Sequence, residues 1–567
     1  MNYFALSLLP LLTVLLAAPS WAQLERPTPD GPDIIQPNTD PLPPVEPLPP
    51  LEDLLPETTD PSIPAPEDIP GEIVVQQFQV VGNTVFSGEV LTELLEPYTN
   101  RPLSFAELLQ VAETLTEAYQ ERGYITSGAF IPEQSMQGGV VTIQAVEGEV
   151  EAINIEGLNR LNSGYIRSRL ARASRPPLNR ERLLNGLQLL QLDPLVETLS
   201  VDLSAGTRPG QSILEVEATE ADATRFDFTV DNQRSPSVGT MRRLSRFTHN
   251  NFLGYGDRFS VGYINTDGSN TLDGLSYTIP LNARNGTLRF THSRGRNNII
   301  EDPFTILDIY SDSTTYQLTY RQPLYQTVQD DLALSLTASW QQSQSFLGLD
   351  DIGPFPFNLG ADNEGKTTVA ALRFIQEYSH RTDNDVLALR SQFSLGLDTL
   401  GATVNEGNIP DSQFLSWRLQ AQYLRLLAPD TILLLRSDFQ LADRSLLAFE
   451  QFAIGGLATV RGYRQDFRSA DNGMFASAEL RLPVLRIPEW DTLVQVAPFV
   501  DIGQVWNTGD IELESPTRLS SVGVGLHLRV GPRFSARVDW GVPLVSVDSN
   551  TETLQEDGLY FSLEYSI

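Results

Sequence analysis

The segment SVGVGLHLRV, residues 521–530, alternates strictly between two kinds of side chain. Valine or leucine occupies every second position from Val522 to Val530, and serine, glycine, histidine and arginine stand between them. Because successive side chains of a strand point to opposite faces, the segment predicts a strand with one apolar and one small or polar face. Such a strand suits a wall that has an apolar medium on one side and water on the other.

The same alternation recurs along the C-terminal part of the chain, for example in DLALSLTASW at 331–340 and in LYFSLEYSI at 559–567. About sixteen segments of this kind lie between Thr224 and Ile567. Their expected centres are residues 229, 245, 262, 276, 291, 318, 337, 372, 391, 420, 437, 479, 500, 524, 538 and 562. An even number of strands, each about ten residues long, predicts a 16-stranded antiparallel transmembrane β-barrel over 224–567. A soluble β-sandwich shows the same alternation and remains the alternative.

The N-terminus predicts export from the cytoplasm. An apolar run from Leu6 to Ala18 is too short to span a bilayer comfortably, and Ser20-Trp21-Ala22 fits a signal-peptidase site. Residues 1–22 are therefore expected to be a signal peptide, with a membrane anchor as the alternative. Residues 23–72 are rich in proline and acidic side chains, a composition that predicts an extended linker rather than a packed domain.

Two similar units follow the linker. Gly82 and Gly157 stand 75 positions apart, and Pro102 and Pro177 keep the same offset, so residues 73–148 and 149–221 are expected to repeat one βααββ fold. The first unit should have strands at 75–81, 124–131 and 140–147, with a capping box at Ser104 and Glu107. A sheet covered by helices on one face leaves an edge strand free to bind an extended polypeptide. We expect that edge near Val75, Phe78 and Val80.

Composition excludes several classes of function. The chain has 39 basic and 72 acidic residues, which argues against nucleic-acid binding, and it has no cysteine for disulfides or thiolate chemistry. The four histidines have no metal-ligand spacing, and no nucleophile elbow or phosphate-binding loop is present. We expect no enzyme, no cofactor and no metal site. Strand acids such as Glu479 and Asp539 are expected to form charge networks with wall arginines, including Arg481 and Arg537.

A long connection at 444–473, between the eleventh and twelfth expected strands, contains GGLATVRGYRQ at 455–465. In the thirteenth strand, alternation directs Phe499, Asp501 and Gly503 into the lumen. If the loop folds inward, the Arg461 guanidinium could bind the Asp501 carboxylate through two parallel hydrogen bonds. Gly462 would permit the tight turn that presents the side chain. A solvated arginine on an outer loop is the alternative.

Taken together, these features resemble the two-partner secretion (type Vb) outer-membrane transporters of the hemolysin secretion/activation type. The likeness rests on two units that look like POTRA domains, on Val460-Arg461-Gly462-Tyr463 in the sixth long loop, on NNFLGYGD at 250–257 and on FVDIGQVW at 499–506. The proline-rich linker and the terminal Ile567 depart from the usual pattern.

The resemblance implies a lumenal contact between Arg461 and Asp501, and a barrel in the outer membrane with its POTRA domains in the periplasm. It also implies a function: an unfolded exported partner, a large exoprotein of hemolysin or adhesin type, is recognised in the periplasm and passed to the cell surface. The barrel is expected to act as a monomer in contact with outer-membrane lipid. A factor that inserts other barrels and a passive porin-like channel remain the alternatives.

Overall fold

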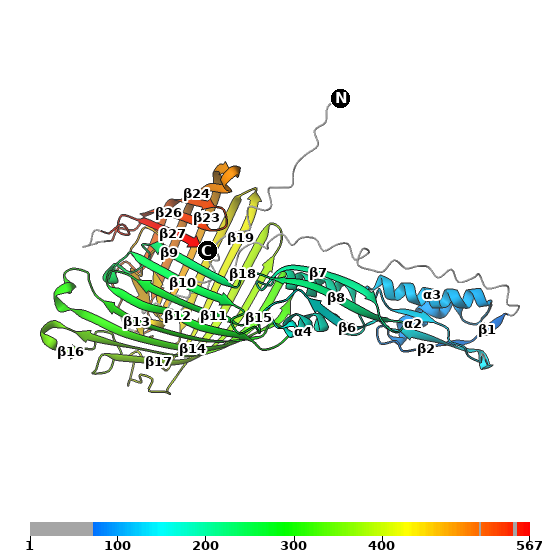
Figure 1. Cartoon of the computed structure of the whole chain (residues 1–567). Helices are drawn as coiled ribbons and strands as arrows, with labels where there is room; N and C mark the ends of the chain where they lie inside the picture. Colours follow the sequence, from blue (N-terminus) through cyan, green and yellow to red (C-terminus); the bar gives the residue numbers. More distant parts are fainter. Residues whose placement is uncertain (1–71, 136, 510–511, 548–552) are drawn as a thin grey trace, which may run out of the picture. The chain divides into compact units, whose positions relative to one another are not determined.

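The computed structural model describes residues 72–135, 137–509, 512–547 and 553–567 (Figure 1). These residues form two compact units, 72–221 and 222–567, which are described separately. The expected signal peptide and all but the last residue of the expected linker lie outside the described residues. No helix in the described part of the chain is long and apolar enough to cross a membrane.

The first half of unit 72–221 has the expected βααββ order, with two short added strands. Its elements are β1 (Ile73–Val75), β2 (Gln77–Val81), α2 (Gly88–Leu95), η3 (Glu96–Tyr98), β3 (Arg101–Leu103), α3 (Phe105–Glu121), β4 (Gly128–Phe130), η4 (Gln137–Gly139) and β5 (Val140–Val146). The sheet order is β2-β5-β4, and β1 pairs separately with β3. The strand predicted at 75–81 is confirmed over Gln77–Val81, but the chain breaks at Gln76 and places Val75 in β1. The strand predicted at 124–131 shortens to three residues after a turn at Tyr124.

Helix α3 begins where the capping box was predicted. The Ser104 hydroxyl accepts the Glu107 backbone N–H, and the Glu107 carboxylate accepts the Ser104 backbone N–H. These bonds and the nearby Arg101 guanidinium lower the pKa of Glu107 to about 2. The helix ends at Glu121 with Arg122 as its C-cap, and Gly123, with φ of 82°, takes the left-handed conformation that follows.

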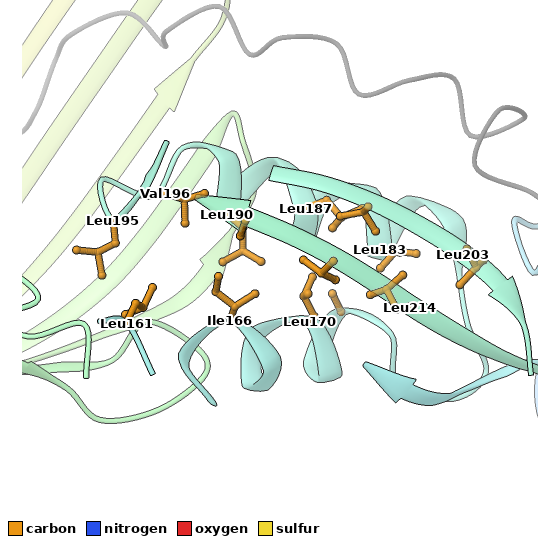
Figure 2. Packing of buried hydrophobic residues seen from close by; sticks show 14 of the residues in the cluster. Leu161, Ile166, Leu170, Leu183, Leu187, Leu190, Leu195, Val196, Leu203 and Leu214 are labelled. Carbon is orange, nitrogen blue, oxygen red and sulfur yellow. The ribbon is translucent and has the colours of Figure 1, made fainter. Parts of the chain in front are cut away.

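The second half repeats the order without the added strands. It contains β6 (Glu149–Glu156), α4 (Ser163–Ala173), α5 (Arg180–Gln191), β7 (Val196–Ala205) and β8 (Gln211–Glu220), with sheet order β6-β8-β7. Leucines at helical spacing on α5 and alternating residues of β8 meet in one buried cluster. Figure 2 shows this packing, with Ile166 and Leu170 from α4 facing Leu183, Leu187 and Leu214. Burial of one face of the helices and the sheet stabilises this half.

The glycine spacing that revealed the repeat has a structural cause. Gly82 and Gly157 have φ of 87° and 86°, and a Cβ on either would lie 2.5 or 2.6 Å from the carbonyl oxygen of Ala145 or Ala218. In each half a glutamate two residues after that alanine accepts backbone N–H groups from the loop after the glycine. Only glycine fits this close crossing, so both halves keep it.

Unit 222–567 is a closed antiparallel barrel, and all sixteen predicted strand centres lie within its strands. The strands are β9 (Thr224–Asp231), β10 (Arg242–Asn250), β11 (Arg258–Asn265), β12 (Ser269–Pro280), β13 (Thr287–Asn298), β14 (Ile309–Gln326), β15 (Asp330–Leu347), β17 (Lys366–Arg381), β18 (Asp385–Leu397), β19 (Leu415–Ala428), β20 (Thr431–Ala442), β23 (Asn472–Ile487), β24 (Thr492–Trp506), β25 (Arg518–Val530), β26 (Phe534–Pro543) and β27 (Leu559–Ser566). In the loop after β15, a two-residue strand, β16 (Gly353–Pro354), pairs antiparallel with the end of β15. β27 pairs with β9 and closes the ring.

The two faces of the barrel wall differ as the alternation predicted. In β25 Val522, Val524 and Leu526 are exposed outward, whereas Ser521 and Gly525 are buried on the inner face. In β15 Leu332, Leu336 and Ala338 are outward and Ser335, Thr337 and Ser339 are inward. An apolar exterior around a polar interior is the arrangement that a membrane-spanning barrel requires.

The carboxylate of Glu220 provides a test of the repeated loop. Burial raises its pKa, but backbone N–H groups of Leu161, Arg160 and Asn159 outweigh that effect and lower the pKa from its ordinary value of 4.5. Glu220→Gln should lower the free energy of unfolding of residues 72–221 by about 1 kcal/mol at pH 7, a modest value because the carboxylate still meets water. Because the folded-state pKa is depressed, this contribution is present above pH 4.5 and is lost as the pH falls below it.

Urea unfolding followed by circular dichroism at neutral and acid pH measures the effect. Glu217→Gln is the matched control, since Glu217 lies exposed on the same strand. Equal effects of the two substitutions at pH 7, or a Glu220→Gln effect that persists unchanged in acid, would contradict the assignment.

Candidate functional site: the inward-folded loop

The connection between β20 and β23, residues 443–471, carries the predicted motif and forms a short ribbon of its own. Strands β21 (Phe452–Ile454) and β22 (Arg468–Ala470) pair, after a single helical turn η8 (Ala448–Glu450). Beyond the ribbon, Gly455 and Gly456 have φ of 111° and 92° and turn the chain sharply. The Gly456 N–H donates to the Tyr463 carbonyl, which closes the tip.

Apolar burial holds this loop against the barrel wall. Phe452, Ile454, Val460, Tyr463 and Ala470 of the loop are almost completely buried. They pack with the wall residues Phe475, Val505 and Leu519. Removing this much apolar surface from water favours the folded-in position of the loop, so Val460 and Tyr463 of the motif act as packing residues.

Arg461 stands at the centre of the contact and is fully buried. Its Nε and Nη2 donate to the Asp501 carboxylate at 2.7 and 2.9 Å, in the bidentate geometry expected from the sequence. Its Nη1 donates to Glu479 at 2.5 Å and to Asp539 at 3.2 Å, and Nη2 also reaches the Ser477 hydroxyl at 3.3 Å. A guanidinium has five N–H donors, and these five acceptors can satisfy all of them.

The predicted wall residues Phe499 and Gly503 also contact the loop motif. The Arg461 Cζ atom lies 3.3 Å from the centroid of the Phe499 ring, a close cation–π contact. A Cβ on Gly503 would lie 2.8 Å from Cγ2 of Val460, so the missing side chain makes room for the loop. Each of the three wall residues proposed from the sequence therefore lies beside the motif.

The carboxylates around Arg461 are shared with two further wall arginines. Arg481 Nε donates to Glu479 at 2.8 Å, and Arg537 Nη2 donates to Asp539 at 2.8 Å and to Glu479 at 3.2 Å. With Asp501, this cluster holds three guanidinium groups and three carboxylates, so its formal charge is balanced. Buried ions are tolerated when they are paired and hydrogen-bonded in this way.

Glycines on both sides allow the backbones to touch. Gly462 has φ of 93°, and its ideal Cβ would lie 3.1 Å from the backbone of Gly541 in β26. A Cβ on Gly541 would in turn lie 2.6 Å from the Gly462 nitrogen. The motif glycine is therefore needed for its conformation and for close approach to the wall.

Several anchors of the loop were missed in the sequence. The Tyr560 hydroxyl of β27 accepts the Gly462 N–H and donates to the Tyr463 carbonyl, and the Tyr463 hydroxyl donates to the carbonyl of Ser520. Arg464 forms a bidentate pair with Glu301 in the loop after β13. Arg373 of β17 does the same with Glu450. Among these anchors, Tyr560 could have been noticed in the sequence, because it is a large ring on the inner face of the last strand, where the other residues are serine and glutamate.

Comparisons with known proteins agree with this architecture. Residues 210–528 match the family described as haemolysin secretion/activation protein ShlB/FhaC/HecB, and residues 73–148 match the ShlB-type POTRA domain. The chain belongs to this haemolysin secretion/activation family. Its fold is therefore a POTRA domain followed by the sixteen-stranded barrel, and its location is the outer membrane, with the POTRA domain in the periplasm.

Proteins with similar sequences are named as transporters. The outer membrane transporter CdiB of Escherichia coli is 26% identical over 497 residues, which cover 86% of this chain and 82% of that protein. The heme/hemopexin transporter protein HuxB of Haemophilus influenzae is 21% identical over 510 residues, 83% of each chain.

Solved structures share the fold. CdiB from Escherichia coli has a TM-score of 0.68 at 23% identity and covers 91% of this chain and 94% of its own. BamA from Haemophilus ducreyi lacking POTRA domains 1–3 has a TM-score of 0.51 at 14% identity and covers 87% of this chain and 100% of its own. At these identities the likeness concerns the fold alone.

The POTRA residues expected to bind a partner separate into two groups. Val75 is fully buried, and its strand β1 is already paired with β3, so the expectation of a free edge at Val75 was wrong. The break at Gln76 explains the error, because it moves Val75 into a second small core. Phe78 and Val80 lie on β2, which pairs with β5 and is an outer strand of its sheet.

One histidine approaches the charge cluster although no ligand spacing marked it in the sequence. Ligand atoms of His527, Glu479 and Asp539 lie within 4.8 Å of one another. Both carboxylates already accept guanidinium N–H groups, and three arginines surround them. Because guanidinium groups already occupy these carboxylates, the arrangement favours an ion network of arginines and carboxylates over a metal site.

The close approach of Gly541 and Gly462 predicts that an alanine at position 541 disturbs the loop more than an alanine at position 503. In Gly541→Ala the new Cβ meets loop backbone, which cannot move without displacing Arg461. In Gly503→Ala the new Cβ meets side-chain methyl groups of Val460 and Ile454, at 2.8 and 3.1 Å, rather than loop backbone. Limited proteolysis of the folded protein in detergent should therefore cleave residues 443–471 much faster in Gly541→Ala than in Gly503→Ala, and equal rates would contradict the backbone contact.

The ion cluster predicts strong coupling between Arg461 and Asp501. Each single alanine substitution leaves one unbalanced charge in the buried cluster and should destabilise the folded barrel by about 3–5 kcal/mol. The double variant should be no worse than either single one, because the stranded charge is then removed. Urea unfolding in detergent followed by tryptophan fluorescence gives the cycle, and additive losses would exclude direct coupling.

Proposed function

We propose that this protein recognises an unfolded exported partner protein in the periplasm through its POTRA domains and secretes it to the cell surface through the barrel. The observation that carries the proposal is the family match over residues 210–528 together with the ShlB-type POTRA match at 73–148. The transporter names of the relatives support the same reading. The cargo is proposed to be a large exoprotein of hemolysin or adhesin type.

The strand edges of the POTRA units are proposed as the recognition surface. In the first unit β2 pairs on one side only, with β5, and in the second unit β7 is an outer strand of ten residues. An extended polypeptide can add to such edges through main-chain hydrogen bonds, which depend little on side-chain sequence. Residues 149–221 are proposed as the second POTRA domain because they repeat the order of elements found at 73–148.

The inward-folded loop is proposed to brace the barrel during transport. Its arginine is fully buried, its acceptors lie on β23, β24 and β26, and its neighbours reach β17 and β27. Moving the loop would strand several charges at once, at a cost of several kcal/mol. We therefore propose that cargo passes beside the seated loop. Without ATP in the periplasm, progress would come from successive binding and from folding of the cargo outside.

Deleting residues 73–148 tests the recognition step. The deletion should abolish surface display of the exoprotein while the barrel remains folded in the outer membrane. Cell-surface immunolabelling of the cargo, with heat-modifiable mobility of the barrel as the folding control, measures both. Unchanged export would overturn recognition through this domain.

The same strains distinguish secretion from barrel assembly. BamA shares the fold, so a general role in inserting outer-membrane proteins is the second candidate. Loss of the gene should remove one exoprotein from the surface and leave the amounts of other folded outer-membrane barrels unchanged. A broad fall in those barrels would instead support assembly.

A further inference from the structure

The motif NNFLGYGD is not used by the loop site, and it forms the turn between β10 and β11. The Asp257 carboxylate is fully buried and accepts the backbone N–H groups of Leu253 and Tyr255 and the hydroxyl of Tyr277. The Asp257 carbonyl accepts the N–H groups of Asn251 and Phe252. This turn, residues 251–257, is therefore held in one shape by its own polar groups.

The rigid turn presents large apolar side chains outward. Phe252 is 42% exposed, Leu253 is 61% exposed and Tyr255 is 65% exposed. Turns in contact with water usually carry small or polar residues, so three large side chains within four residues of a fixed turn indicate an apolar neighbour. Two other turns at the same end of the barrel, Thr327–Gln329 and Thr382–Asn384, are polar, whereas the turn Pro488–Trp490 also presents a large ring, Trp490, which is 69% exposed.

The turn continues the lipid-facing surface of the barrel. Aromatic rings on the outer face form an unbroken row, from Phe226 to Phe247 at 4.9 Å, to Phe259 at 6.5 Å and to Phe252 at 5.2 Å between ring centroids. Phe226 alternates with inward residues of β9, and its neighbours in the row belong to the same face. The apolar surface thus extends from the strands round their ends onto the turn.

The turn also lies at the point where the chain enters the barrel. The Asn250 N–H donates to the Ala223 carbonyl, directly before β9 begins at Thr224. His249 of β10 faces Thr224 in the strand register. The POTRA region precedes Ala223 in the chain, so this end is the periplasmic one.

We propose that turn 251–257 is a membrane-interface anchor whose Phe252, Leu253 and Tyr255 side chains are buried among phospholipid in the periplasmic leaflet. The occupant is a lipid surface, because the exposed apolar side chains are continuous with the face that already contacts lipid. A tyrosine with an apolar ring and a polar hydroxyl suits the headgroup boundary. The anchor fixes the depth of the barrel at the place where the POTRA region joins it, and it does not depend on the identity of the cargo.

Because the chain has no cysteine, a single introduced thiol can be labelled cleanly. Leu253→Cys carries an environment-sensitive fluorophore in full-length protein reconstituted in phosphatidylethanolamine and phosphatidylcholine nanodiscs, in which both faces meet the solvent. Asp383→Cys, on the exposed polar turn between β17 and β18, is the matched control. Lipid carrying a nitroxide near the headgroup end of the acyl chain and dissolved iodide serve as the two quenchers.

The label at Leu253 should show blue-shifted emission, several-fold stronger quenching by nitroxide lipid than the control, and weak quenching by iodide. The label at Asp383 should respond mainly to iodide. If Leu253→Cys does not fold, as judged by heat-modifiable mobility, Tyr255→Cys provides the same measurement. Iodide quenching at position 253 equal to that of the control, or protection from both quenchers that requires added exoprotein, would overturn the lipid anchor.

Discussion

A single buried guanidinium organises the loop and the adjoining wall. Arg461 lies within hydrogen-bonding distance of Asp501, Glu479 and Asp539, which come from three strands, β24, β23 and β26. These contacts are needed because an ion removed from water must be paired; otherwise its burial costs several kcal/mol of folding free energy. The glycines at 462, 503 and 541, the ring of Phe499 and the balancing arginines on the wall can each be understood as conditions for seating this one group.

The apolar packing of the loop has a different role from the ion cluster. Phe452, Ile454 and Tyr463 supply non-directional burial that brings the loop inward. The guanidinium then selects one position among many, because its donors have fixed directions and charged acceptors. This division explains why a four-residue motif contains both kinds of residue. Val460 and Tyr463 are buried in the apolar cluster, and Arg461 between them faces the wall.

Local patterns in the sequence predicted much of this structure, and the limits of that prediction follow from geometry. Alternation is a property of each strand, so the barrel and the inward direction of Asp501 could be predicted without knowing which strands are neighbours. Glu479 and Asp539 converge on the same guanidinium because of the stagger between neighbouring strands, which pairs Glu479 with Phe499. This stagger cannot be read from the residues of a single strand. The burial of Val75 was missed for a similar reason, since a one-residue break at Gln76 reversed its surroundings.

The contacts of the loop tip with the last strand have a consequence for how the barrel forms. Tyr560 of β27 holds the backbone at Gly462 and Tyr463, and Gln555 joins Gln465 to the carbonyls of Asn232 and Arg234 beyond β9. The loop therefore contacts β27 directly and is linked through Gln555 to the residues that follow β9, next to the final strand pairing at Asp227–Asp231. By thermodynamic linkage, ring closure favours seating of the loop to the same extent that seating favours ring closure. If a chain inserted with its loop outside the barrel, the pairing between its first and last strands would therefore be weakened, although both strands lie far from the motif in the sequence.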